Sequence, residues 1–337
     1  MTRTDRLQAD LERGFEALED GKLDAAATIL DRCKRIDRKN PDVVMLAAAV
    51  ADASGDATEA LARYRQLIEL RPDDPMPRIC VARLELHDQG DADAALDTVE
   101  AAFDFIDEEA DLIEAIFVKT EAYLARGELA SARETLGELA SSVIDDAELA
   151  LDLAELALAA EDPEAARRYL AIPEHDPEMR ADALHALGRV HEFTGDRTAM
   201  INTWQEVRRL DLAAPPGAVQ VSEDELERIA QATLEELPAH IRERLANVPI
   251  LIDDMPAIEV VDDGFDPRSL GLFTGTPMPE DGMAQPSVTN IHLYKRNLER
   301  SAVDEDHLAE EIRITVLHET AHYFGLDEDD LVQLGLD

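Results

Sequence analysis

The sequence has few cysteines, few aromatic residues and no long apolar run. Two cysteines in 337 residues, Cys33 and Cys80, are too few for a disulfide framework or a four-thiolate zinc site, so we expect buried free thiols. Aromatic residues make up only 4%, which favours closely packed small helices over an aromatic-rich β-sandwich. Since no stretch of about 18 apolar residues occurs and no apolar run follows the basic N-terminal residues, we expect a cytoplasmic protein.

Basic residues are also scarce, because 32 Lys and Arg stand against 75 Asp and Glu, for a formal charge of -43. A field of this sign repels phosphate backbones and anionic lipid headgroups. Adaptation to high salt and simple solvation of the surface both account for so acidic a composition. The charge therefore argues against DNA, RNA and membranes as partners, and it predicts partners that are basic or hydrophobic.

A pattern of apolar helix, short turn and second helix recurs along the first two thirds of the chain. The residues at these turns are 33 to 37 positions apart: Gly21, Gly55, Gly90, Gly127, Asp162 and Gly195. Such regular self-similarity is typical of stacked helical hairpins. We therefore predict six hairpins that form a curved solenoid with a concave groove over about residues 5–212.

The repeat resembles the tetratricopeptide repeat family in its period and in its small residues. Gly14 and Gly188 each lie seven residues before a turn glycine, where that family prefers Gly. An alanine lies five residues after four of the turn glycines, at Ala26, Ala60, Ala95 and Ala132. The resemblance implies a groove that binds a protein or peptide partner, and a spacer or a surface for the chain's own C-terminal domain is the alternative.

The repeat pattern ends after Leu212, where the segment AAPPG has two prolines that stop a helix and a glycine that frees the backbone. We predict a repeat domain over residues 1–212, a linker over 213–220 and a second domain over 221–337. The expected fold is therefore mainly α, with a helical-repeat solenoid followed by a small α+β domain.

The second domain is predicted to open with a helix, because Ser222 and Glu225 form a capping box, and this helix ends near Pro238. Further elements follow from the apolar patterns: strands at 248–253 and 288–294, a weaker strand at 257–261, a long loop at 262–287 and a helix from Asp304 that Gly325 ends.

This last helix carries the sequence HETAH. Residues four apart point the same way on a helix, so His318 and His322 can hold one ion between them, and neutral imidazoles suit zinc. Glu319, beside the first histidine, is then placed to take a proton from water as a general base. Gly325 lets the chain turn back toward the ion.

Residues 221–337 as a whole resemble the minimal zincins, small bacterial metallopeptidases with the pattern His-Glu-x-x-His-x-x-Gly-x-x-Asp. The likeness includes the stretches LPAHIRERLANV, LGLF and DDLVQLGLD, and NIHLYKRNLE, which we expect to be a strand throughout. It implies a zinc cofactor held by His318 and His322, with Glu319 as the catalytic base.

The third zinc ligand differs from the family pattern. Six residues after His322, where the family has Asp, this sequence has Glu328, which we predict to be the ligand. Asp327 and Asp329 flank it and stay as alternatives, and an acidic turn that caps the next helix is the other interpretation of these carboxylates.

Two tyrosines near the motif, Tyr294 and Tyr323, either donate a hydrogen bond to an oxyanion or pack with a wet hydroxyl. The motif as a whole predicts a zinc metallopeptidase whose repeats recruit a protein or peptide. The alternative is a protein-interaction scaffold whose zinc site is structural or only weakly catalytic. Glu319 favours the peptidase, because a structural site has no use for a general base.

Overall fold

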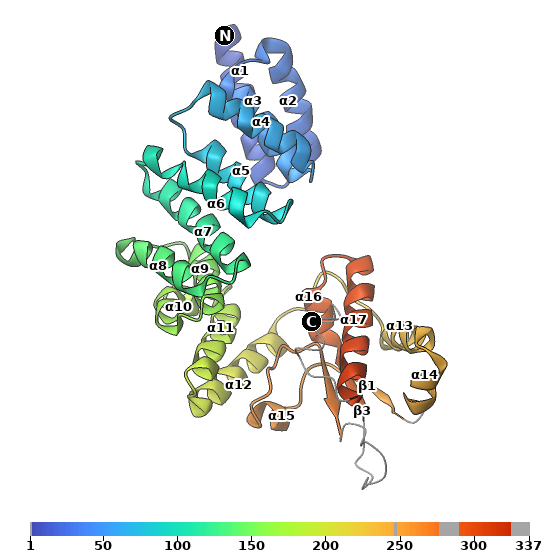
Figure 1. Ribbon diagram of the computed structural model, residues 1–337. Coiled ribbons are helices and arrows are strands. Elements are labelled where there is room, and N and C mark those ends of the chain that lie inside the picture. Colours follow the sequence, from blue (N-terminus) through green and yellow to red (C-terminus); the bar gives the residue numbers. More distant parts are fainter. Residues whose placement is uncertain (1, 246–247, 276–289, 325–337) are drawn as a thin grey trace. The chain divides into compact units, whose positions relative to one another are not determined.

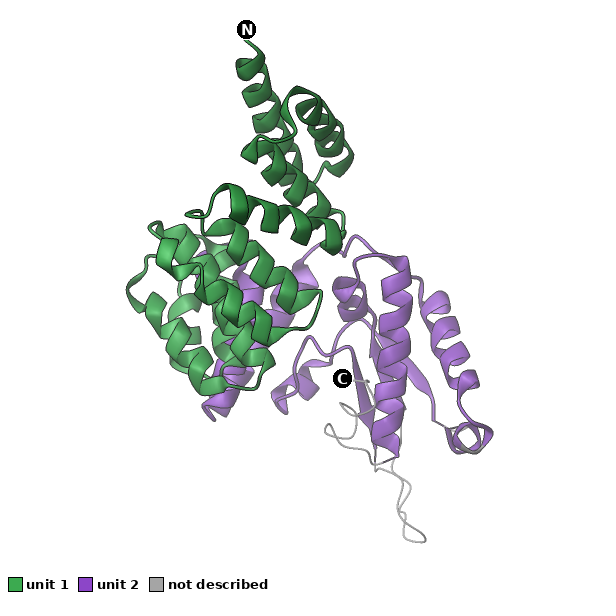
Figure 2. Ribbon diagram, turned by 45° about the horizontal axis from the view of Figure 1, so that its top comes forward, with its two compact units in different colours: residues 1–173 green, residues 174–337 purple. Residues whose placement is uncertain are grey.

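The computed structural model describes residues 2–245, 248–275 and 290–324. The chain forms two compact units, unit 1 (Met1–Pro173) and unit 2 (Glu174–Asp337), coloured green and purple in Figure 2. The division falls between the fifth and sixth hairpins of the repeat array. The predicted domain boundary after residue 212 stays a prediction, because a compact unit is not by itself evidence of independent folding.

Twelve helices of the described chain form six hairpins, as the repeat spacing predicts (Figure 1). Unit 1 contains the first five: α1 (Arg3–Glu19) with α2 (Leu23–Asp37), α3 (Pro41–Ala53) with α4 (Ala57–Leu70), α5 (Met76–His87) with α6 (Ala92–Glu100), α7 (Glu109–Ala125) with α8 (Leu129–Gly137), and α9 (Ala147–Ala159) with α10 (Pro163–Leu170). Unit 2 begins with the sixth, α11 (Arg180–Phe193) with α12 (Arg197–Ala213). Three short 3₁₀ turns lie at Phe103–Phe105, Glu138–Ser141 and Pro173–His175.

The turns inside the hairpins have one shared geometry. All five turn glycines are left-handed, with φ between 66° and 74°, and the first residue after each one is the N-cap position of the next helix. The fifth turn corrects the sequence interpretation, because the left-handed residue there is Glu161 (φ 56°) and Asp162 instead caps α10 by accepting from the Ala165 N–H. With Glu161 in this role, both neighbouring spacings become 34 residues.

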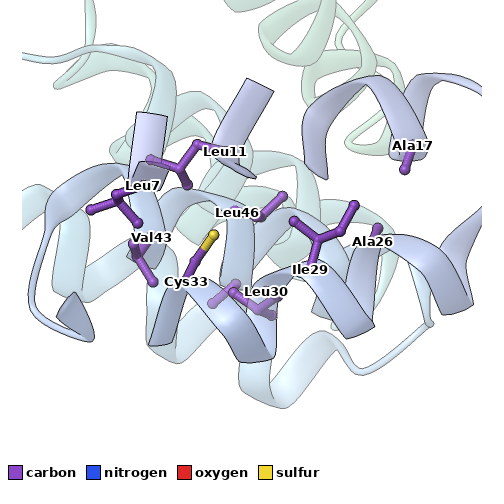
Figure 3. Close-up of a cluster of buried hydrophobic side chains, with 10 residues drawn as sticks. Leu7, Leu11, Ala17, Ala26, Ile29, Leu30, Cys33, Val43 and Leu46 are labelled. Atoms are coloured by element: carbon purple, nitrogen blue, oxygen red, sulfur yellow. The ribbon is translucent and has the colours of Figure 1, made fainter. Parts of the chain in front are cut away.

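Small residues let the helices of the repeats approach closely. The four alanines that mark the repeats are fully buried, and a Cβ added at Gly14 would lie 2.6 Å from the side chain of Leu46. The core around the first hairpin is therefore apolar and tight, as Figure 3 shows for a cluster that includes Leu7, Leu11, Ile29 and Leu30. Burial of this apolar surface is the main stabilising term for the stack.

The C-terminal part of unit 2 is a small α+β fold. Its elements are α13 (Glu223–Glu236), α14 (Ala239–Leu245), β1 (Ile250–Asp253), α15 (Ile258–Asp262), β2 (Gly271–Thr274), β3 (Asn290–Tyr294), α16 (Lys295–Ser301) and α17 (Glu305–Tyr323). The strand order is β1-β3-β2, with β1 parallel and β2 antiparallel to β3. Helices α13 and α17 pack together, with α13 on β1 and α17 on β2 and β3, and they bury Ile291 and Leu293 of β3.

Four local predictions for this part were wrong. Residues 258–262 form a helix and not a strand, because Val261 packs on the apolar face of α11 and α12. Residues 271–274 form a strand inside the predicted loop, too short for a clear alternating pattern. The stretch NIHLYKRNLE is strand followed by helix α16. Only half of the predicted capping box forms, since Ser222 accepts from the Glu225 N–H while the Glu225 carboxylate binds Arg228.

None of the described helices is both long enough and apolar enough to cross a bilayer.

Candidate metal centre

Helix α17 presents the motif on its last two turns. Asp304 caps its start by accepting from the His307 N–H. One face of the helix is buried along Leu308, Ile312 and Val316, and Glu319 continues that face toward the C-terminal end. The rotation of about 100° per residue then places His318 on an adjacent, less buried side.

The two histidines converge. The Nε2 atoms of His318 and His322 are 3.0 Å apart and the ring centroids are 4.7 Å apart. Two ligand nitrogens on one tetrahedral zinc, each at about 2.0–2.1 Å, are separated by roughly 3.3 Å. The side chains of His318 and His322 therefore fit one shared zinc ion with little rearrangement.

Glu319 is buried, with 6% of its surface exposed, and it lies against the edge strand β2. A Cβ added at Gly271 would meet the Thr315 methyl carbon at 2.7 Å, and both Cγ and Oε1 of Glu319 at 2.9 Å. Glycine is therefore required at this position because a side chain has no room there, and not because of the backbone dihedral angles. The carboxylate of Glu319 is positioned between its own helix and the backbone of β2.

Strand β2 lies at the edge of the described sheet and pairs only with β3 there. Since the Tyr294 N–H donates to the Leu270 carbonyl, the hydrogen-bonded pairs alternate, and the backbone groups of Gly271 and Phe273 point away from β3. An extended peptide can add to such an edge through main-chain hydrogen bonds. This edge lies beside Glu319.

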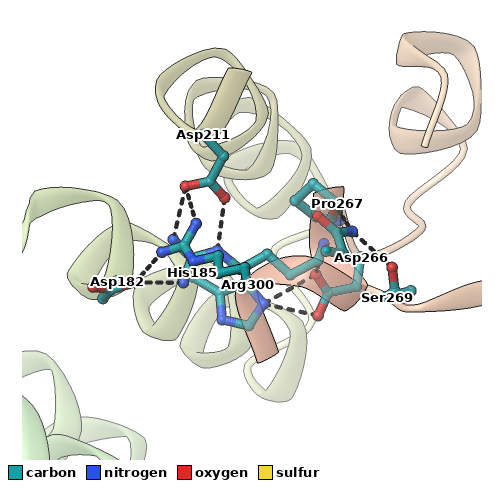
Figure 4. Close-up of polar contacts among 9 residues, drawn as sticks. Asp182, His185, Asp211, Asp266, Pro267, Ser269 and Arg300 are labelled. Carbon is teal, nitrogen blue, oxygen red and sulfur yellow. Dashed lines mark hydrogen bonds and ion pairs between the residues drawn. The ribbon is translucent and has the colours of Figure 1, made fainter. Parts of the chain in front are cut away.

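A partly buried ionic cluster ties the sixth hairpin to the C-terminal part of the same unit (Figure 4). Asp211 of α12 accepts from Arg268 at 2.8 and 3.0 Å and also from Arg300, and Asp182 of α11 accepts from both arginines at 2.7 Å. Burial raises the pKa of the Asp211 carboxyl, but hydrogen bonds and charge from Arg268 and Arg300 outweigh this and hold it below its ordinary value.

More contacts from this hairpin hold the segment that leads into β2. His185 of α11 lies 2.8 Å from the Asp266 carboxylate, and Arg208 of α12 donates to the Pro256 carbonyl at 2.6 Å. Within the C-terminal part, Asn297 donates to the backbone carbonyls of the same segment at 2.7 and 2.9 Å. The path from residue 256 to β2 is thus fixed by side chains of α11, α12 and α16.

The two candidate tyrosines have different surroundings. Tyr294 is 2% exposed at the end of β3, beside Phe265, and burial raises the pKa of its hydroxyl, with Asp253 and Glu319 adding to the shift. Tyr323 packs edge-on against Phe273 and donates to the Arg244 carbonyl at 3.5 Å. Their participation in chemistry stays a prediction.

The third ligand falls outside the described residues, as do both of its alternatives. Glu328, Asp327, Asp329 and Gly325 all belong to the segment 325–337. Within the described ranges no group of three His, Cys, Asp or Glu side chains is placed to hold a metal. The structure therefore supplies two convergent donors, His318 and His322, and the ligand set stays a prediction.

Comparisons with known proteins match the two parts of the chain to two different families. Residues 245–336 match the family model described as zincin-like metallopeptidase, and residues 17–84 match that of the tetratricopeptide repeat. The chain joins tetratricopeptide repeats to a zincin-like metallopeptidase domain. No curated protein matches it.

Solved structures resemble the repeat part of the chain. PilW, a type IV pilus biogenesis factor, superposes with a TM-score of 0.51 at 15% identity, over 60% of this chain and 92% of PilW. Pseudomonas aeruginosa pilF gives a TM-score of 0.50 at 18% identity, over 62% of this chain and 93% of that one. At these identities the likeness shows the fold of the repeats alone.

Two features near the zincin-like site were not predicted from the sequence. Gly271 was noticed only as part of a resemblance, although a glycine inside a short apolar stretch is a signal of close backbone approach. The ionic cluster of Asp211, Arg268 and Arg300 had no local signal, because its members are separated by up to 89 residues and each looks like an ordinary surface charge.

Proposed function

We propose that the C-terminal part of this protein is a zinc-dependent peptidase and that the repeats recruit its protein or peptide partner. The convergence of the His318 and His322 nitrogens beside the buried Glu319 carries this proposal. The match of residues 245–336 to the zincin-like family also supports it. The match to tetratricopeptide repeats supports recruitment of a protein partner.

In this proposal each group of the chain has a defined task. When bound, zinc supplies a Lewis acid that makes water acidic near neutral pH and polarises a carbonyl oxygen. His318 and His322 hold the ion as neutral imidazoles. Glu319 accepts a proton from water at its carboxylate and donates it to the departing amine nitrogen.

Substrate positioning is assigned to β2. An extended peptide pairs with the outward backbone groups of Gly271 and Phe273, which places it along the edge next to Glu319. Because main-chain bonds carry little sequence information, such a strand holds many peptides, and specificity then comes from elsewhere in the chain.

Metal analysis with two variants tests the proposal. We expect the purified chain to contain zinc, His318→Ala to lose it, and Glu319→Gln to keep it while hydrolysis of a quenched fluorescent peptide library falls by about 10² to 10⁴-fold. Glu319→Gln is the matched control for metal binding. Zinc retained by the wild type without any hydrolysis would favour the alternative, an interaction scaffold with a structural zinc site, and no zinc in the wild type would overturn both.

For the third ligand we propose Glu328. Two histidines alone leave the site too open to hold zinc tightly, so a carboxylate must complete it. Glu328→Ala is expected to weaken zinc binding at least about tenfold, or roughly 1.4 kcal/mol, while Asp329→Ala does not. In a zinc-competition titration, the reverse order assigns the ligand to Asp329, and no effect from either change points to Asp327 or to a site that is not a zincin site.

A further inference from the structure

The start of strand β2 has few anchors of its own. The strand spans four residues and, in the described sheet, pairs only with β3. Its first residue, Gly271, has no side chain to pack, because Glu319 and Thr315 of α17 occupy the space where a Cβ would lie. Glycine weakens a strand, and a strand this short depends on tertiary contacts for its conformation. The position of β2 therefore depends on what holds the segment before it.

The sixth hairpin contacts that segment along most of its length. Its middle residue Val261 is fully buried in an apolar core that α11 and α12 provide. Three side chains of α12 also donate hydrogen bonds to it: Arg208 to the Pro256 carbonyl at 2.6 Å, Gln205 to the Asp262 carboxylate at 2.5 Å, and Arg197 to the Asp263 carbonyl. Since the match to the zincin-like family begins at residue 245, this support comes from a repeat outside the matched residues.

The last anchor before β2 is Arg268, three positions ahead of the strand. Its guanidinium donates to Asp211 at 2.8 and 3.0 Å and to Asp182 at 2.7 Å. Its backbone N–H donates at 2.7 Å to the carboxylate of Asp266, which His185 also contacts at 2.8 Å (Figure 4). A planar guanidinium with several directed hydrogen bonds fixes an orientation as well as a distance. Side chains of the sixth hairpin therefore define where the backbone enters β2.

We propose that Arg268 is a positioning residue of the peptidase: held by the sixth hairpin, it keeps the start of β2 against Glu319 and its outward backbone groups aligned for an extended peptide. The inference rests on the proposed function, in which β2 pairs with the substrate. Ion pairs shielded from water add little net stability compared with apolar contacts, so a geometric role accounts better for a cluster of this kind. The sixth repeat is then a part of the peptidase, whereas recruitment belongs to the other repeats.

Kinetics of Arg268→Ala in the full-length protein test this proposal. Zinc content should be unchanged, because His318 and His322 lie on α17. The KM for a quenched fluorescent peptide should rise at least about tenfold, since a substrate that pairs with a displaced strand binds less well. Arg268→Lys keeps the charge but not the planar fork and should recover part of the loss. The matched control is Arg228→Ala, which removes an exposed ion pair with Glu225 of α13 and should leave KM unchanged.

A purely structural role of Arg268 predicts a different result. Loss of folded molecules lowers the apparent kcat and leaves KM as it was. Leu226→Ala supplies this comparison, because it removes a fully buried side chain from α13 in the core of the same unit. An Arg268→Ala variant that follows Leu226→Ala, with a lower apparent kcat and the KM of the wild type, would overturn the proposal.

Hydrogen exchange at the Leu272 amide provides a readout that needs no peptidase activity. This N–H belongs to a hydrogen-bonded pair with His292 of β3, so it reports whether the strand is in place. We expect its protection, followed by NMR, to fall at least about tenfold in Arg268→Ala, and that of amides in α17 to change less. Equal losses in β2 and α17 would reject a positioning role. A wild type that hydrolyses no peptide would overturn the proposed peptidase, while exchange would still decide whether Arg268 holds β2.

Discussion

The first and last hairpins of the repeat array have the same helix packing but contact different parts of the protein. In both, a glycine lets a large side chain of the next or partner helix approach, Leu46 over Gly14 and Trp204 over Gly188. The first hairpin buries an apolar cluster that is continued by α3 (Figure 3). The last hairpin carries the charged residues Asp182 and Asp211 toward the zincin-like part of its own unit (Figure 4). The same periodic signal thus describes a repeat that stacks on repeats and a repeat that supports a different fold.

The difference between these hairpins lies in residues that the repeat pattern does not constrain. The glycines and alanines set how closely helices approach, and they recur because every hairpin needs them. The outer positions are free to vary, so they decide what packs on the stack. Periodicity therefore identifies an architecture, while single buried charges identify what that architecture holds.

Of the changes that test this comparison, Asp211→Ala should cause the largest loss of stability, in unit 2. It removes the more buried of the two carboxylates that Arg268 and Arg300 share and leaves Asp182 in place. Removal of one partner from a buried ion pair costs about 3 kcal/mol, with some relief because Asp182 remains and Arg300 is partly exposed. Urea unfolding followed by fluorescence of Trp204, the single tryptophan, reports on unit 2.

The control for this change lies on the same helix. Glu206→Ala removes an exposed ion pair with Arg209, and its effect should stay below about 1 kcal/mol. Equal effects of Asp211→Ala and Glu206→Ala would mean that the ionic cluster adds nothing beyond surface pairing, and the hairpin would then be held by its apolar contacts alone.

The glycines of the two hairpins should tolerate alanine differently. A Cβ at Gly188 would lie 2.0 Å from Nε1 of Trp204, a rigid ring that is 2% exposed, so Gly188→Ala should destabilise unit 2 by about 2 kcal/mol through overpacking. A Cβ at Gly14 meets the flexible end of Leu46, and the better helix propensity of Ala offsets part of the clash, for a net cost of about 0.5 kcal/mol. Thermal unfolding of both variants measures the difference, and equal costs would contradict it.

Gly271→Ala extends the same test to the candidate site, where close approach serves chemistry and not stacking. The added methyl displaces Glu319, so we expect about a tenfold loss of peptide hydrolysis, or roughly 1.4 kcal/mol, with zinc content unchanged. Leu272→Ala, on the opposite face of β2, is the control and should retain activity. Loss of zinc in Gly271→Ala would show that the strand supports the metal ligands and not the base.

Lowering the pH should change the stability of the two units in opposite directions, and by less than the substitutions above. In unit 2 the Asp266 carboxyl resembles that of Asp211. Burial raises its pKa, but the hydrogen bond and charge of His185 outweigh this and hold the pKa below its ordinary value. A carboxyl with a lowered pKa stabilises the fold above its unfolded value of about 3.9, and this contribution is lost as pH falls through the lower folded value. Unit 2 should therefore lose stability below about pH 4.

In unit 1 the sign is reversed. Burial raises the pKa of Glu121, against the opposing effect of His87, and burial with three nearby carboxylates raises that of Asp152. The folded state then binds protons more readily than the unfolded chain, so these groups favour unit 1 increasingly as pH falls from 7 toward about 4. Hydrogen exchange of the two units between pH 7 and 3.5, corrected for intrinsic rates, measures both trends. Parallel loss of protection in both units would contradict them.

Much of the fold follows from the sequence because repetition multiplies weak signals. One glycine says little, but five in equivalent turns locate five of the six hairpins, and the motif on α17 is recognisable because its residues are close in sequence. Strand β2 and helix α16 were missed because each is only a few residues long and depends on tertiary contacts for its conformation. The Gly271 contact with Glu319 joins residues 48 positions apart, and no local pattern encodes such a distance.

The position of the boundary between the units bears on how such chains change in length. The hairpins of a repeat array interact mainly with neighbouring hairpins, so a whole hairpin can be gained or lost with little effect on distant ones. The sixth hairpin is an exception, because its loss would expose Arg268 and Arg300 and release the segment before β2. Duplication or deletion of a repeat is thus tolerable among the hairpins of unit 1, while the sixth hairpin must be inherited together with the zincin-like domain.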